Sequence, residues 1–94
     1  MTDIENRAKR IVYDLAKAVE EWRGKHGGRD PVIVMPARMI ATVALGAAGV
    51  IGVEGERGTL LGCYLDVTSD DRQGGRVYLA EELPMVTEGT EVAV

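Results

Sequence analysis

Residues able to act as nucleophiles or general bases are few in this sequence, and their spacing does not bring them together. The chain has one cysteine, one histidine and one serine, at Cys63, His26 and Ser69. Nucleophilic catalysis requires a nucleophile within hydrogen-bond reach of a base that a third group orients. The neighbours of Cys63 at two-residue spacing are Leu61 and Leu65, which predicts a buried, inert thiol. We therefore predict no catalytic residues and a protein that is not an enzyme.

Patterns for metal or phosphate binding are equally sparse. A zinc site takes three or four Cys or His ligands, and the chain has two such residues in all. The turn Ser69–Asp71 has too few carboxylates in register for a calcium loop. The glycines of residues 46–58 echo a phosphate-cradling loop, but the Lys-Ser/Thr pair of such loops is missing. Two acidic pairs, Glu54 with Glu56 and Glu81 with Glu82, could be paired carboxylates for acid–base catalysis. Charged residues at exposed strand ends account for both pairs equally well. We expect no metal and no cofactor.

Five residues are candidate contacts with a protein or a ligand. They are one aromatic residue and four arginines: Tyr13, Arg38, Arg57, Arg72 and Arg76. Tyr13 lies off the apolar stripe of its segment among charged residues, where an exposed aromatic side chain can anchor an interface. The arginines, together with the glycine-rich loops, could contact an anionic small ligand such as a nucleotide.

Charge is unevenly divided along the chain, whose net charge is −4. Residues 1–29 hold seven basic and five acidic side chains, whereas residues 30–94 hold four and ten. Nucleic-acid binding needs clustered Lys and Arg, so an acidic body argues against it. A basic helix and an acidic remainder suit head-to-tail contact between copies, which closes into a ring if the rotation allows.

The location that the sequence predicts is cytoplasmic, or virion-associated. A single cysteine cannot form an internal disulfide, which fits a reducing compartment. The first residues, MTDIENRAK, are too polar for a signal peptide. No apolar run reaches the length of a bilayer span, so we expect no membrane partner.

The first element to position these residues is a helix over residues 1–24. Thr2 and Glu5 form a capping box, and Gly24 supplies the stop. The apolar positions alternate in steps of four and three: Ile4, Ala8, Ile11, Leu15, Ala18 and Trp22. This spacing predicts one buried face that packs on a sheet, with Trp22 as a core anchor.

The rest of a single domain spanning residues 1–94 is an α/β body over residues 31–83 and a short strand or tail over 84–94. Val32–Met35, bounded by prolines, predicts a strand buried on both faces, and Pro36 opens a helix that Gly46 ends. Further predicted strands are Val50–Val53, Thr59–Thr68 and Arg76–Ala80, the last two as a hairpin. In the Thr59–Thr68 strand, Leu61, Cys63, Leu65 and Val67 are predicted to face the core, and Leu60 the other side. The fold class is therefore α+β, with two layers and a mixed sheet of three to five strands.

The order of these parts resembles the axial domain of tailed-phage major capsid proteins and of the related encapsulin shell proteins. The resemblance covers residues 8–83 and rests on Val32–Pro36, Leu60–Gly62, Val67–Asp71 and Val77–Glu82. The sequence departs from the family at Met35, where a polar residue is usual, and at Cys63-Tyr64, which replaces Pro-Val. The family's peripheral domain, extended loop and N-terminal arm do not fit in 94 residues, so the resemblance implies an axial domain alone.

Two functions follow as hypotheses. The first is a non-enzymatic phage- or prophage-type structural or interaction protein that acts through an oligomeric surface, with a protein partner as a further possibility. The uncharged stretch Met39–Val53 is the candidate surface, since a domain of this size has little interior in which to bury it. The alternative is a counter-defence protein that binds and sequesters a nucleotide signal.

Overall fold

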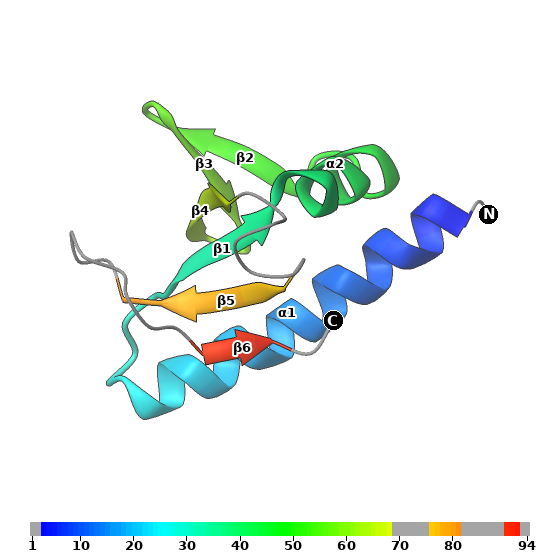
Figure 1. Cartoon of the computed structure of the whole chain (residues 1–94). Helices are drawn as coiled ribbons and strands as arrows, with labels where there is room; N and C mark the ends of the chain where they lie inside the picture. Colours follow the sequence, from blue (N-terminus) through cyan, green and yellow to red (C-terminus); the bar gives the residue numbers. More distant parts are fainter. Residues whose placement is uncertain (1–2, 69–75, 82–89, 93–94) are drawn as a thin grey trace.

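The computed structural model describes residues 3–68, 76–81 and 90–92 (Figure 1). Its two helices are α1 (Asp3–Lys25) and α2 (Ala37–Gly46). The six strands are β1 (Val32–Pro36), β2 (Ile51–Glu54), β3 (Arg57–Leu60), β4 (Cys63–Thr68), β5 (Val77–Ala80) and β6 (Thr90–Val92). The α+β class is confirmed, and β6 confirms the last short strand. The predicted capping residue Thr2 lies outside the described residues.

The strands form one mixed sheet in the order β2-β3-β4-β1-β5-β6. Strand β1 lies in the middle, parallel to β4 and antiparallel to β5. The predicted hairpin between the Thr59–Thr68 region and the Arg76–Ala80 strand is therefore wrong, because β1 lies between β4 and β5. Val32, Ile33 and Met35 are buried, as expected for this strand, whereas Val34 on the face away from the helices is half-buried.

The predicted single strand Thr59–Thr68 is two strands joined by a two-residue turn. Leu61 and Gly62 have φ of 56° and 76°, the left-handed values that a tight hairpin turn requires. The turn pairs Leu60 directly with Cys63, so both side chains point to the same face, and both are buried. The predicted facing of Leu60 is therefore wrong, and Val67, predicted to face the core, is exposed. The extra strand raises the count to six, above the predicted three to five.

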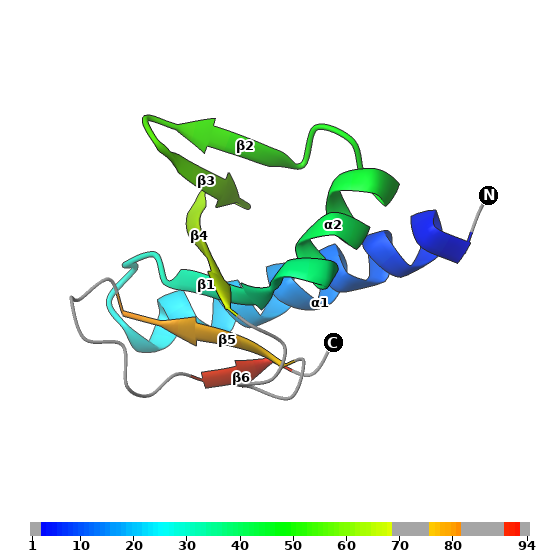
Figure 2. The same cartoon turned by 45° about the horizontal axis from the view of Figure 1, so that its top comes forward.

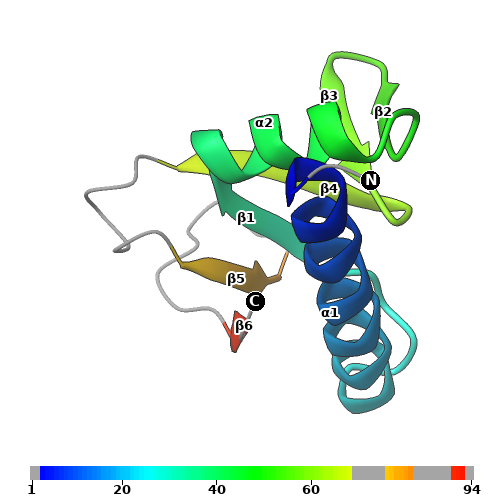
Figure 3. The same cartoon turned by 90° about the vertical axis from the view of Figure 1, so that its right-hand side faces the viewer.

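Helix α1 lays one side against the sheet (Figures 1 and 3). The described part of the predicted stripe is buried at Ala8, Ile11, Leu15 and Trp22, with Val19 in place of the half-buried Ala18. Ile4 is exposed, because only the end of α2 approaches the first turn of α1. The helix ends later than Gly24: the amide of Gly28 donates to the carbonyl of Arg23 at 2.9 Å, and Gly27 has φ of 66°.

Helix α2 packs on the same face of the sheet as α1, and the two helices touch at Gly46 (Figures 2 and 3). Its start follows β1 directly, with the extended Pro36 as N-cap. A Cβ atom at Gly46 would lie 2.5 Å from the carbonyl oxygen of Ile4 and 2.6 Å from the Cβ of Ala8. Only glycine permits this approach, so one residue both ends α2 and seats it on α1.

Candidate functional site

Of the three residues that sequence analysis considered for catalysis, the structure describes Cys63 and His26. Cys63 is buried in the core, where burial raises the pKa of its thiol although Arg23 lies 3.8 Å from the sulfur. This confirms burial and fits an inert thiol. Within the described ranges no group of three or more His, Cys, Asp or Glu side chains could hold a metal ion. Ser69 and the acidic turn Ser69–Asp71 lie outside them.

His26 has a structural role at the end of α1. Its ring stacks on the indole of Trp22 with 3.6 Å between centroids and 7° between planes. Its Nδ1 lies 2.8 Å from the carbonyl oxygen of Trp22. A carbonyl oxygen only accepts, so Nδ1 carries the proton and donates, and Nε2 is left unprotonated in the neutral ring. The ring thereby satisfies one of the carbonyls that a helix end leaves without a partner.

The second face of the sheet carries two of the candidate arginines. Arg57, Asp66, Val34, Tyr78 and Glu91 fall in one row across five strands and point away from the helices. The guanidinium of Arg57 lies 3.4 Å from Asp66 and 3.9 Å from the centre of the Tyr64 ring. Arg76 lies 3.1 Å from Glu91. Both cations thus face a carboxylate already, which weakens their capacity to hold a phosphate.

The other candidate contact residues are spread over the surface. Tyr13 is 64% exposed on α1, with the Lys17 ammonium 5.9 Å from its ring centre. Arg38 is exposed near the start of α2. Arg72 lies outside the described residues. The four described candidates therefore do not converge on one site.

The glycine-rich stretch 46–58 is not a phosphate cradle. Its central part is the hairpin of β2 and β3, whose two-residue turn contains Gly55 with φ of 64°. Gly52 and Gly58 lie inside strands, where ladder bonds occupy backbone groups that a phosphate loop would aim at its ligand. The predicted strand Val50–Val53 is confirmed, shifted by one residue.

The most unusual surface is the stretch 39–53, which we call the uncharged edge. It comprises α2 from Met39 onward, the connection 47–50 and β2 as far as Val53, and it contains no charged residue. Leu45 and Val53, 75% and 77% exposed, are the most exposed large apolar side chains of the described part. Three further exposed residues of this stretch are small and apolar: Ala41 and Ala44 on α2, and Ala48 in the connection after it. Of the ten residues of α2, only Val43 is fully buried.

The backbone of β2 adds hydrogen-bonding groups to this edge. Strand β2 is the outermost strand of the described sheet on its side. In a two-residue hairpin the residues that close the turn, here Glu54 and Arg57, exchange both hydrogen bonds, and the pattern alternates from there. The N–H and C=O groups of Val53 and Ile51 therefore point away from β3, toward the open edge. An exposed apolar strand with such groups is a template for pairing with another chain.

Comparison with known proteins does not identify this surface. No protein-family model, no curated protein and no solved structure matches the chain.

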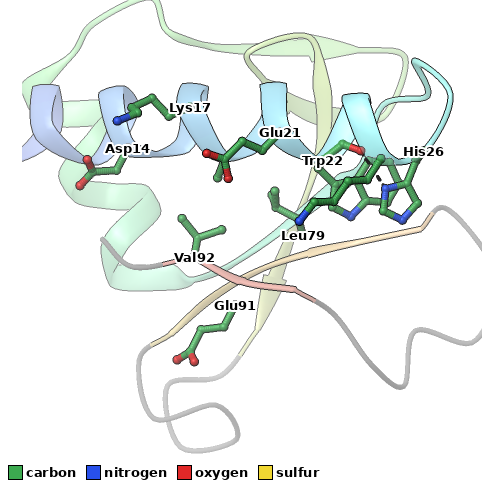
Figure 4. Close-up of a pocket in the computed structure, with 10 residues that line it drawn as sticks. Asp14, Lys17, Glu21, Trp22, His26, Leu79, Glu91 and Val92 are labelled. Carbon is green, nitrogen blue, oxygen red and sulfur yellow. Dashed lines mark hydrogen bonds between the residues drawn. The ribbon is translucent and has the colours of Figure 1, made fainter.

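At the opposite end of the sheet, α1 and β6 enclose a groove of about 290 Å³ (Figure 4). Its apolar lining is Trp22, Leu79, Val92 and Ala18. Charged residues of α1 form its rim: Asp14, Lys17, Glu21 and Lys25. Sequence analysis missed this groove, because it lies between a helix and a strand that begins 65 residues after the helix ends, and no local pattern predicts that contact. Within the sequence, only the four-residue spacing of Trp22 and His26, two residues of the groove lining, pointed to this region.

Neither of the described helices combines the length and the apolar character that a bilayer span needs.

Proposed function

We propose that this protein is a non-enzymatic assembly or interaction protein of the phage or prophage type, and that it works by self-association through the uncharged edge. The observation that carries the proposal is the exposure of Leu45 and Val53 on a stretch of fifteen residues without a charge. The phage assignment rests on the resemblance to capsid axial domains. Those domains meet one another around symmetry axes, which is in keeping with a surface built for contact between copies.

The uncharged edge is an unfavourable surface for a monomer in water. Exposed apolar side chains that gather on one helix and one strand mark an interaction site or an aggregation hazard. Natural edge strands are protected by charged side chains, by proline or by a covering segment. The only charged residue of strand β2 is Glu54 at its end, and the residue before it, Val53, is exposed. A partner that covers the edge would bury Val53 and Leu45 and pair the outward backbone groups.

A nucleotide-sequestering function is less favoured. Arg57 and Arg76 each face a carboxylate, and the glycine-rich stretch is a hairpin. A nucleotide would have to displace Asp66 or Glu91 before it could use either guanidinium. A nucleotide-induced thermal shift would revive this alternative.

Light scattering over a range from low micromolar to near-millimolar concentration tests the proposal. The mass of the wild type should rise above the 10.1 kDa of one chain as concentration increases. Val53→Lys should remain at 10.1 kDa over a range where the wild type associates, because it places a charge on the edge. The matched control is Val67→Lys: Val67 is 66% exposed, but its strand has β3 and β1 on its two sides. A wild-type mass of 10.1 kDa at every concentration would refute the proposal.

A further inference from the structure

We infer that the surface receiving the uncharged edge is the groove between α1 and β6 of a second copy, so that copies join head to tail with β2 of one beside β6 of the next. This inference rests on the proposed function, because it names the partner surface for the same edge. It follows from three features of the described residues: the two free strand edges, the face to which Val53 points, and the division of charge.

The first feature is that both ends of the described sheet are open. Strands β2 and β6 are the two outermost strands, and neither has a second neighbour among the described strands. Each therefore presents backbone donors and acceptors along one side. Strands β2 and β6 both run parallel to β1, since two antiparallel pairings separate each of them from β1. A second copy with its helices on the same side therefore adds β2 parallel to β6.

The second feature is that the side chains match. Ile51 is paired with Leu60, which is buried on the helix-covered face, so Ile51 and Val53 point to that face. The groove lies on the same face, between α1 and β6, with Trp22, Leu79 and Val92 in its lining (Figure 4). In a sheet continued from β6 into β2 of the next copy, Val53 would enter this groove. Residues 50–53 would bring no charge into the groove, because they carry none.

The third feature separates this contact from the obvious alternative, in which β2 of one copy pairs with β2 of another. A β2–β2 contact joins two acidic regions and brings Glu54 of both copies to one short interface. The head-to-tail contact instead keeps the two copies of Glu54 apart and sets each beside a rim of mixed charge, with Lys17 and Lys25 next to Asp14 and Glu21. Avoiding like charges opposite one another in this way selects partner and orientation.

Mixing two one-sided variants tests the inference. Val53→Pro removes one outward N–H of β2 and leaves the groove intact. Strands tolerate proline at such an edge position. Ala18→Arg fills the groove and leaves β2 intact, and Asp14 and Glu21 lie at helical spacing to receive the new guanidinium. Each variant alone should remain at 10.1 kDa, and an equimolar mixture should give a dimer of twice that mass that grows no further. Asn6→Arg, also on α1 but outside the groove lining, should keep the wild-type mass.

The outcomes separate the two proposals. If Ala18→Arg still associates like the wild type, or if two folded monomeric variants do not combine, the head-to-tail contact is refuted while self-association through the uncharged edge stands. A monomeric wild type refutes both. Circular dichroism checks that each variant is folded, and Val53→Lys replaces Val53→Pro in the mixture if the proline variant is not.

Discussion

The two helices of this protein differ in the character of their exposed sides. Helix α1 buries one side of 23 residues and presents charged residues on the other, whereas α2 has one charged residue, Arg38, and its later exposed positions, Ala41, Ala44 and Leu45, are apolar. The outer side of α1 is explained by water, since charged side chains are solvated there. The outer side of α2 is not explained within one copy. An apolar outer side of a helix is normally buried, and this difference is the reason why we propose a partner for α2 and the strand after it.

The largest expected effect contrasts two leucines, one on each helix. Leu15→Ala should lower the free energy of unfolding by about 2–5 kcal/mol. The Leu15 side chain is fully buried on the inner side of α1, and its truncation leaves a cavity. Leu45→Ala should change it by less than about 0.5 kcal/mol in dilute, monomeric protein, as surface substitutions do. Urea unfolding measures both. A large loss for Leu45→Ala would mean that α2 is held by contacts of Leu45 within the monomer.

The next contrast uses two glycines. Gly46→Ala should cost about 1–3 kcal/mol, because the new methyl group would overlap Ile4 and Ala8 of α1. Gly24→Ala should instead stabilise the fold by about 0.5–1 kcal/mol, since Gly24 lies inside α1 and a Cβ there meets nothing within 4 Å. Thermal unfolding of the two variants gives the comparison. Equal behaviour would show that the contact between α1 and α2 is looser than described.

A smaller effect concerns pH and Cys63. Burial raises the pKa of this thiol in the folded state, so folding favours the protonated form. Its contribution to stability is full below the pKa of the unfolded chain, about 8.5, and is lost as pH rises toward the higher folded pKa. Above about pH 8.5 the wild type should therefore lose stability more steeply than Cys63→Ala. Parallel slopes for the two proteins, or rapid labelling of the native thiol, would contradict the buried, protonated state.

Much of the fold could be predicted from the sequence because its signals are local. The spacing from Ala8 to Trp22 identifies the buried side of α1, and the prolines around Val32–Met35 identify the central strand. The hairpin prediction failed because strand order depends on which distant segment inserts between neighbours, and β1 inserts between β4 and β5. The turn at Leu61 was missed because leucine rarely adopts positive φ, so the alternating pattern continued through it.

The candidate surface was only half predictable. The absence of charge from Met39 to Val53 marked one side of the contact, since that property is read along the chain. The groove under α1 required the tertiary structure, because Trp22 and Val92 meet there from opposite ends of the sequence.

Residue-resolved amide hydrogen exchange at low and high protein concentration tests the central claim most directly. The N–H of Val53 points to the open edge, while that of Gly52 faces Thr59 on β3. If copies associate through the uncharged edge, exchange at Val53 should slow as concentration rises, and exchange at Gly52 should change much less. Exchange at Val53 that stays fast while the mass of the particle increases would place the contact elsewhere on the molecule and contradict the account.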